Sequence, residues 1–206
     1  MAGCDAPRPV HPVVEFVEIL LQAPWGRFDP SPGFCAAQPL APSRRWRSRA
    51  YHARVHITIG REDPAPAAVA AVLAELPEGV AMPRPTASYL AAAEHMVTYL
   101  ATTAEGEVVG VLLLEPHFEE SVEVYLMAVR SGYLRQGIGR RLLAVIEADA
   151  RAFGVRLVEV KTVGPSDPNP RAAATRAFYR DVGFLPVEEF PGLWEGKPAL
   201  VMIKAL

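Results

Sequence analysis

Cysteine is scarce in this chain: among 206 residues there are two, Cys4 and Cys35. They supply neither a disulfide framework nor a cysteine-based zinc site, so a reducing, cytoplasmic environment is predicted. No apolar run approaches the roughly 20 residues of a membrane-spanning helix. The opening residues, MAGCDAPRPVHP, lack the basic start and long apolar stretch of a signal peptide. No membrane partner is therefore expected.

Excess charge of either sign is also lacking. Lys and Arg number 21 against 23 Asp and Glu, for a formal net charge of -2. A protein that binds nucleic acid or an anionic surface usually carries a broad basic face, which this balance does not indicate. The one short basic cluster, SRRWRSR (43–49), could bind an anion, but a solvated surface segment is the commoner outcome. No nucleic-acid partner is expected.

Proline is abundant, and its distribution divides the chain. Eight of the 20 prolines precede residue 43. Residues 1–50 are therefore predicted to be a proline-rich extension whose order the sequence leaves open, with a single short helix at Val13–Gln22. Residues 51–206 are predicted to form the folded domain.

Within that domain, apolar residues alternate with periods typical of strands and helices in turn. Strands are predicted at 54–59, 97–103, 107–115, 121–129, 155–163, 184–190 and 199–204, and helices at 65–76, 87–96, 136–153 and 171–182. This order predicts an α/β fold, a mixed sheet with helices packed against it.

The most informative segment is a glycine loop, SGYLRQGIGRRLL (131–143), between the strand 121–129 and the helix after it. Glycines before a helix N-terminus let an anion approach the unpaired backbone N–H groups of the first turn. A dinucleotide fingerprint requires a third glycine where Leu142 stands, and a P-loop requires Lys where Arg140 stands. A tight turn without a ligand is the other interpretation of an isolated glycine pair.

A third pattern fits. VEVYLMAVRSGYLRQGIGRRLL (122–143) resembles the acetyl-CoA-binding motif of the GNAT superfamily of N-acetyltransferases, with Leu134 in place of the usual leading Arg or Gln. ATRAFYRDVGFLPVEEF (174–190) resembles the second motif of this superfamily, and the segment 97–115 resembles its strands before the loop. The resemblance implies a mostly antiparallel sheet of six to seven strands, helices on both faces, and central strands 121–129 and 155–163 that splay apart.

The resemblance also implies the reaction, acetyl transfer from acetyl-CoA to a primary amine of a small molecule or peptide, with both substrates bound together. The residues expected to bind acetyl-CoA are Met127, Ala128, Val129, Leu134, Arg135, Gln136, Gly137, Ile138, Gly139 and Arg140, with Asn169 as a further contact. Asn169 could equally cap the next helix. Arg141 could add charge at the loop.

Two residues are expected to carry the chemistry. Tyr179 matches the position of the superfamily's general acid, although a helix-end aromatic that packs on Phe184 is the alternative. Glu123 lies four residues before Met127, where some members place a base. Strict alternation would put Glu123 on the face of Tyr125, Met127 and Val129, and partial burial would raise its pKa. An ordinary exposed strand residue is equally compatible with the sequence.

The sequence leaves open the roles of His117, of the C-terminal segment and of catalysis itself. His117 in EPHFEE (115–120) has no second histidine at ligand spacing, so a solvated loop and no metal site are predicted. The C-terminal segment PALVMIKAL could pair across a homodimer. A module that binds acyl-CoA without turnover is the alternative to an enzyme, and the acceptor amine is not identified by the sequence.

Overall fold

The computed structural model describes residues 56–62, 64–76, 80, 82 and 84–206. The chain divides into two units, Met1–Arg49 and Ala50–Leu206. The helix expected at Val13–Gln22 and the basic cluster 43–49 lie outside the described residues. None of the described helices is long and apolar enough to cross a lipid bilayer.

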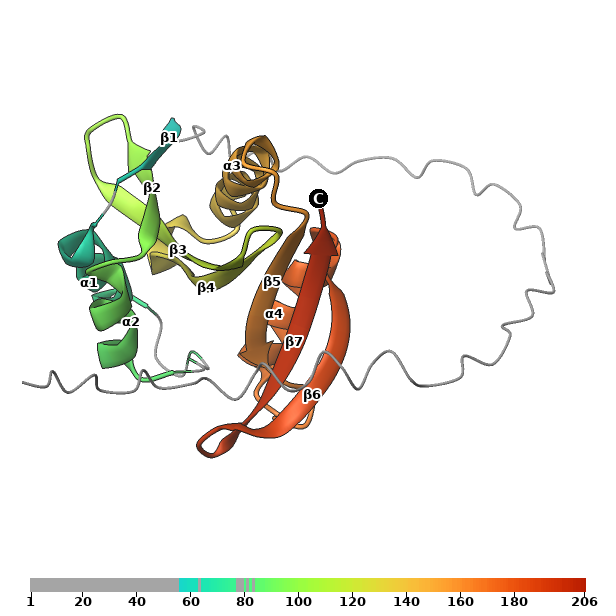
Figure 1. Cartoon of the computed structure of the whole chain (residues 1–206). Helices are drawn as coiled ribbons and strands as arrows, with labels where there is room; N and C mark the ends of the chain where they lie inside the picture. The colour runs from blue at the N-terminus through green and yellow to red at the C-terminus, as the bar shows by residue number, and fades with distance from the viewer. Residues whose placement is uncertain (1–55, 63, 77–79, 81, 83) are drawn as a thin grey trace, which may run out of the picture. The chain divides into compact units, whose positions relative to one another are not determined.

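A single twisted sheet organises the described residues (Figure 1). It has seven strands in the order β1-β2-β3-β4-β5-β7-β6, and every neighbouring pair is antiparallel except β4 and β5, which are parallel. The strands are β1 (Ile57–Arg61), β2 (Val97–Thr103), β3 (Val108–Phe118), β4 (Ser121–Val129), β5 (Leu157–Val163), β6 (Leu185–Trp194) and β7 (Lys197–Ala205). The predicted mixed, mostly antiparallel sheet is confirmed.

Helices cover both faces of this sheet, as predicted. One hydrophobic cluster joins α1 (Pro66–Ala74) and α2 (Thr86–Ala93) to β3 and β4, and the other joins α3 (Ile138–Ala152) and α4 (Pro170–Asp181) to the opposite face. Among the buried residues of α3, Ile138, Leu142, Leu143, Ile146 and Ala150 are spaced so that they make one apolar stripe. Burying each large aliphatic side chain contributes about 1.5–3 kcal/mol, so α3 is anchored firmly behind the glycine loop.

The two central strands diverge. β4 and β5 pair only from Ser121 opposite Leu157 to Val124 opposite Val160, and beyond that point β5 pairs with β7 alone. The backbone of the second half of β4 is therefore not hydrogen-bonded to β5. The predicted splay of the strands is confirmed (Figure 1).

A β-bulge interrupts β4 and corrects the expected alternation. Leu113 pairs with Leu126 but Leu114 pairs with Val124, so Tyr125 is an extra residue. The bulge reverses the side-chain pattern after it: Met127 and Val129 pack with the α3 side, whereas Tyr125, Leu126 and Ala128 pack with the α1–α2 side. The prediction that Glu123 shares a face with Met127 and Val129 is therefore wrong.

The C-terminal strand does not offer a free edge. β7 is hydrogen-bonded to β5 on one side and to β6 on the other, so the edge strands of the sheet are β1 and β6. Pairing of PALVMIKAL across a dimer, as the sequence suggested, would require β6 to leave. This pairing would thus need a rearrangement of the sheet, and the homodimer itself stays a prediction.

Candidate active site

A groove of about 930 Å³ runs between the end of β4, the glycine loop and α4, and is called here the β4–α4 groove. Most residues predicted to bind acetyl-CoA line it: Met127, Ala128, Val129, Leu134, Arg135, Gly137, Ile138, Gly139 and Arg140. Gln136 and Asn169 do not line it. The Gln136 side chain donates to the Gly132 carbonyl at 3.3 Å, and Asn169 caps α4 by accepting from the Arg171 N–H at 2.9 Å. The capping alternative for Asn169 is the one the structure shows.

The splay leaves backbone donors of β4 facing this groove. The Arg130 N–H donates to the Val109 carbonyl on β3 at 2.9 Å. Because backbone N–H groups alternate along a strand, those of Ala128 and Leu126 also face β3, and those of Met127 and Val129 face the opposite side. That side is where β5 has diverged, so these two N–H groups are available to a ligand.

The glycine loop supplies a second set of donors. Gly137 is the N-cap of α3 with φ 80°, a left-handed conformation that favours glycine, and no side chain caps the helix. The first intrahelical bond runs from the Arg141 N–H to the Gly137 carbonyl, which leaves the N–H groups of Ile138, Gly139 and Arg140 without helical partners. Together with the helix dipole, they form a site suited to a diphosphate.

Side chains around the loop leave this site open. A Cβ at Gly139 would lie 3.3 Å from Cζ of Phe178, so glycine permits α3 and α4 to approach closely here. Arg140 turns toward Asp181, with Nη2 and Oδ2 3.6 Å apart. Arg141, expected to add charge at the loop, instead donates to the Ile57 carbonyl of β1. Arg135, with φ 63°, remains beside the groove.

Tyr179 lies on α4 and lines the same groove. It is 5% exposed and makes edge-to-face contacts with Phe178 and Phe184 at centroid distances of 5.3 and 5.4 Å. Its hydroxyl has no hydrogen-bond partner among the described residues. Burial raises the pKa of Tyr179 well above its ordinary value of 10, so the phenol stays protonated at neutral pH. The structure shows the aromatic packing of Tyr179 on Phe184 and its place in the groove, and its role as general acid stays a prediction.

Glu123 lies at the point where β4 and β5 separate, and it is 1% exposed. Oε2 of Glu123 is 2.9 Å from Nε2 of His117 and 2.5 Å from Nζ of Lys161, and Oε1 is 3.6 Å from Nη1 of Arg84. Burial alone would raise the pKa of this carboxyl, but the His117 hydrogen bond and the charges of Lys161 and Arg84 lower it below its ordinary value. The predicted raised pKa of Glu123 is therefore wrong, and the carboxylate is anionic at neutral pH.

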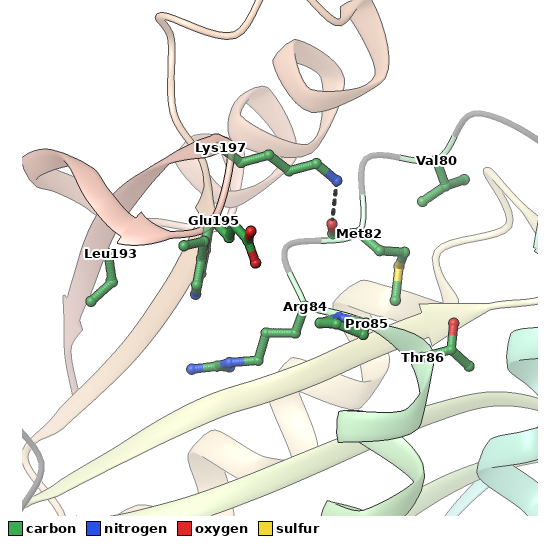
Figure 2. Close-up of a pocket in the computed structure, with 9 residues that line it drawn as sticks. Val80, Met82, Arg84, Pro85, Thr86, Leu193, Glu195 and Lys197 are labelled. Carbon is green, nitrogen blue, oxygen red and sulfur yellow. Dashed lines mark hydrogen bonds between the residues drawn. The ribbon is translucent and has the colours of Figure 1, made fainter.

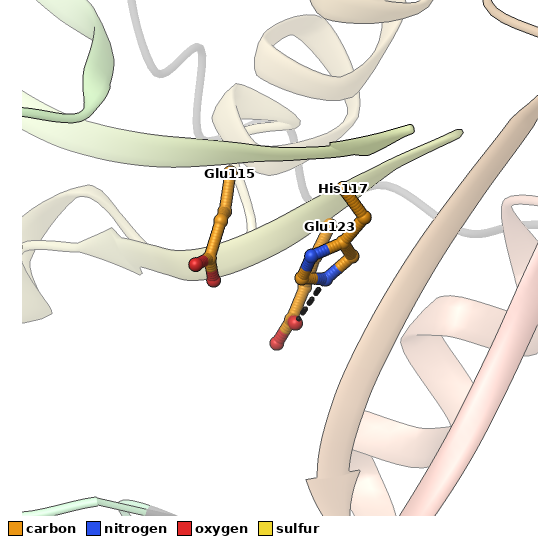
Figure 3. A group of neighbouring side chains, drawn as sticks. All are labelled: Glu115, His117 and Glu123. Atoms are coloured by element: carbon orange, nitrogen blue, oxygen red, sulfur yellow. Dashed lines mark hydrogen bonds and ion pairs between the residues drawn. The ribbon is translucent and has the colours of Figure 1, made fainter. Parts of the chain in front are cut away.

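His117 corrects another expectation. β3 extends to Phe118, so His117 lies in a strand rather than in a loop; it is exposed, as predicted, and its ring faces Glu123 (Figure 3). The hydrogen bond to Glu123 is the main cause that raises the pKa of His117. Ligand atoms of Glu115, His117 and Glu123 lie within 4.8 Å of one another, a spacing that could hold a cation, although the Lys161 ammonium already contacts Glu123.

A second cavity, of about 570 Å³, adjoins the groove, and the sequence does not predict which residues line it. This Arg84 cavity is lined by Val80, Met82, Arg84, Pro85, Thr86, Leu193, Trp194, Glu195 and Lys197. Figure 2 shows the Lys197 ammonium donating to the Met82 carbonyl, a bond of 2.7 Å that links β7 to the segment before α2. Val80 and Met82 line both cavities, so the two adjoin. The contribution of the β6–β7 hairpin to this cavity depends on tertiary contacts, so no local sequence pattern predicts it.

The site combines three features: a parallel strand pair that splays apart, a helix N-terminus that faces the opening, and a second cavity beside it. Together these features are typical of an acyltransferase fold. The sequence profile described as "Acetyltransferase (GNAT) family" matches residues 42–184, and this chain belongs to that family. Acyl transfer from acetyl-CoA is accordingly its class of reaction. No curated protein sequence matches the chain.

Solved structures share the fold. A GNAT family acetyltransferase from Elizabethkingia anophelis with acetyl-CoA bound is 20% identical with a TM-score of 0.53, over 73% of this chain and 98% of that one. Ard1 from Thermoplasma volcanium is 19% identical with a TM-score of 0.57, over 72% and 97%. The ribosomal-protein-S18-alanine N-acetyltransferase from Escherichia coli is 18% identical with a TM-score of 0.59, over 73% and 94%.

Proposed function

We propose that the protein transfers the acetyl group of acetyl-CoA to a primary amine of a small molecule or peptide by direct attack in a ternary complex. The observation that carries this proposal is the meeting, in one groove, of the free β4 donors, the helix N-terminus at Gly137 and the Tyr179 side chain. Each element faces a different part of the same elongated ligand. Acetyl-CoA, when bound, supplies the acetyl group and a thiolate leaving group.

The residues of the groove bind and polarise this ligand. The N–H groups of Ile138, Gly139 and Arg140 would hold the diphosphate, with Arg135 beside them. The N–H groups of Met127 and Val129 would bind the pantetheine arm and donate to the acetyl carbonyl oxygen as negative charge develops there. Removing one such donor in acyl transfer typically costs about 10²–10³ in kcat.

Tyr179 is proposed as the general acid. As the nitrogen–carbon bond forms and the carbon–sulfur bond breaks, the Tyr179 hydroxyl donates its proton to sulfur. Burial raises the pKa of Tyr179, and burial in the same groove would also raise the pKa of the departing thiol. The two pKa values therefore remain close enough for proton transfer. A phenol without a hydrogen-bond acceptor in the described chain is free to donate to the substrate.

Glu123 is proposed to help remove the proton that the amine loses. A carboxylate with a lowered pKa holds a proton poorly, so it acts best as one member of a relay. His117 contacts the same carboxylate oxygen and is partly exposed to solvent, so it completes a path by which the proton leaves. The amine proton would thus reach water through Glu123 and His117.

The test is thiol release from acetyl-CoA by the purified full chain across aminoglycosides, polyamines, amino acids and N-terminal peptides, with acetyl-CoA binding measured by calorimetry. We expect thiol release with at least one class and formation of the corresponding N-acetyl product. Binding of acetyl-CoA with no thiol release across the panel would contradict the proposal and favour a module that binds acyl-CoA without turnover.

A further inference from the structure

The Arg84 cavity contains a guanidinium held between two aromatic rings. Cζ of Arg84 lies 4.1 Å from the ring centroid of Tyr125 on β4 and 5.9 Å from that of Trp194 at the end of β6. Stacking on aromatic faces fixes the plane of a guanidinium, and with it the direction in which its N–H groups point. Arg84 is therefore positioned by two rings that lie far apart in the sequence, of which Trp194 lines the cavity and Tyr125 lies on the adjoining strand β4.

The hydrogen-bonding capacity of this guanidinium is not used by the described residues. Its side chain is 22% exposed, and its ion pair with Glu123, at 3.6 Å between Nη1 and Oε1, is longer than a hydrogen bond. The Oε1 atom of Glu123 is itself buried, and no described residue forms a hydrogen bond with it. A largely buried group with five donors is stabilised when a ligand accepts from it, and the planar fork matches a carboxylate.

The charges that line the cavity indicate the charge of that ligand. Arg84 and Lys197 are cationic and Glu195 is anionic, which leaves one net positive charge among the lining residues. The Glu123 carboxylate, which pairs with Arg84, reduces the positive potential in the cavity further. A singly charged carboxylate matches this balance better than a doubly charged phosphate does.

We propose that Arg84 binds a carboxylate of the acceptor, so that the acceptor is an amine that also carries a carboxylate, such as a free amino acid. This inference rests on the proposed acetyl transfer. Because the Arg84 cavity adjoins the β4–α4 groove at Val80 and Met82, an acceptor anchored by its carboxylate at Arg84 can extend its amine toward the groove. Arg84 then determines specificity, while the acetyl-transfer residues remain those named above.

Product binding tests the inference without turnover. N-acetyl derivatives of the common amino acids would be titrated calorimetrically into the full chain in the presence of CoA. The affinity of each acid would be compared with that of the corresponding carboxamide, which lacks the carboxylate. We expect some acids to bind about 10- to 100-fold more tightly than their amides, the range for hydrogen bonds to a charged group. Arg84→Gln should abolish that preference, Arg84→Lys should retain part of it, and Arg151→Gln, which changes an exposed arginine on α3, should leave it unchanged.

The outcomes separate the two proposals. If no acid is preferred over its amide, or if Arg84→Gln keeps the preference, the carboxylate site is refuted even when acetyl transfer is observed. If Arg84 only neutralises Glu123, its replacement should weaken the binding of acid and amide equally. That result would also refute the inference. If acids are preferred through Arg84 while no amine is acetylated, the carboxylate site stands and the proposed activity fails.

Discussion

Replacement of Tyr179 by phenylalanine separates catalysis from stability. The hydroxyl has no hydrogen-bond partner among the described residues, and the edge-to-face contacts with Phe178 and Phe184 survive the change. The free energy of unfolding should therefore change by less than about 1 kcal/mol. General acid catalysis by a positioned group contributes about 10²–10⁴-fold, so kcat should fall by that factor while acetyl-CoA affinity is kept. This loss corresponds to about 2.7–5.5 kcal/mol in the barrier.

A matched control is the same replacement at Tyr99, a buried tyrosine on β2. Its hydroxyl donates to Oδ2 of Asp149 at 2.8 Å, away from the groove. Tyr99→Phe should therefore destabilise the fold by about 1.5–3 kcal/mol and leave kcat unchanged, the opposite of Tyr179→Phe. Urea denaturation and initial rates of thiol release measure both quantities. If Tyr179→Phe keeps kcat within about threefold, a smaller effect than general acid catalysis gives, the assignment of the acid is refuted.

Further changes test the loop and the buried charges. Gly137→Ala should cost about 1–2 kcal/mol because φ is 80°, whereas Gly132→Ala, at an ordinary φ with open space around it, should not destabilise; urea denaturation compares them. The raised pKa of His117 means that its stabilising contact with Glu123 is complete below its ordinary value of 6.5 and is lost as pH rises through the raised pKa. Wild type should therefore lose stability over that interval, and His117→Asn should not; parallel pH profiles would contradict the contact. Glu123→Gln should destabilise by about 3 kcal/mol, because the Lys161 ammonium loses its buried partner, and should lower thiol release; an unchanged unfolding midpoint would refute this.

Much of the fold could be predicted because its local signals agree with one another. The predicted strand at 121–129 has the same bounds as β4, and α3 and α4 begin and end within two residues of prediction. In α3 the apolar stripe, the glycine before it and the strand before that all indicate one arrangement. A fold can be predicted from a sequence when its local patterns and its global arrangement agree in this way.

The errors arose where tertiary contacts override local pattern. The bulge at Tyr125 leaves no mark in the composition of β4, so strict alternation predicts Met127 and Val129 on the face of Glu123, whereas they lie on the opposite face. The pKa of Glu123 depends on Lys161, which lies 38 residues away on another strand. Lys161 lies among valines in the strand LVEVKTV, where a cation requires an anionic partner, but Glu159 in the same strand is one such partner, so the pattern does not point to Glu123.

The extra residue at Tyr125 has a consequence for how this chain can change. Glu123 and Tyr125 lie on the Arg84 side of the sheet, and the backbone of the same strand beyond the bulge faces the β4–α4 groove. Deleting Tyr125 would restore regular alternation along β4, with Glu123 still on the α1–α2 side, and would remove the ring over which the Arg84 guanidinium lies. The length of β4 at the bulge therefore affects the position of Arg84 as well as the face that each later side chain of β4 occupies.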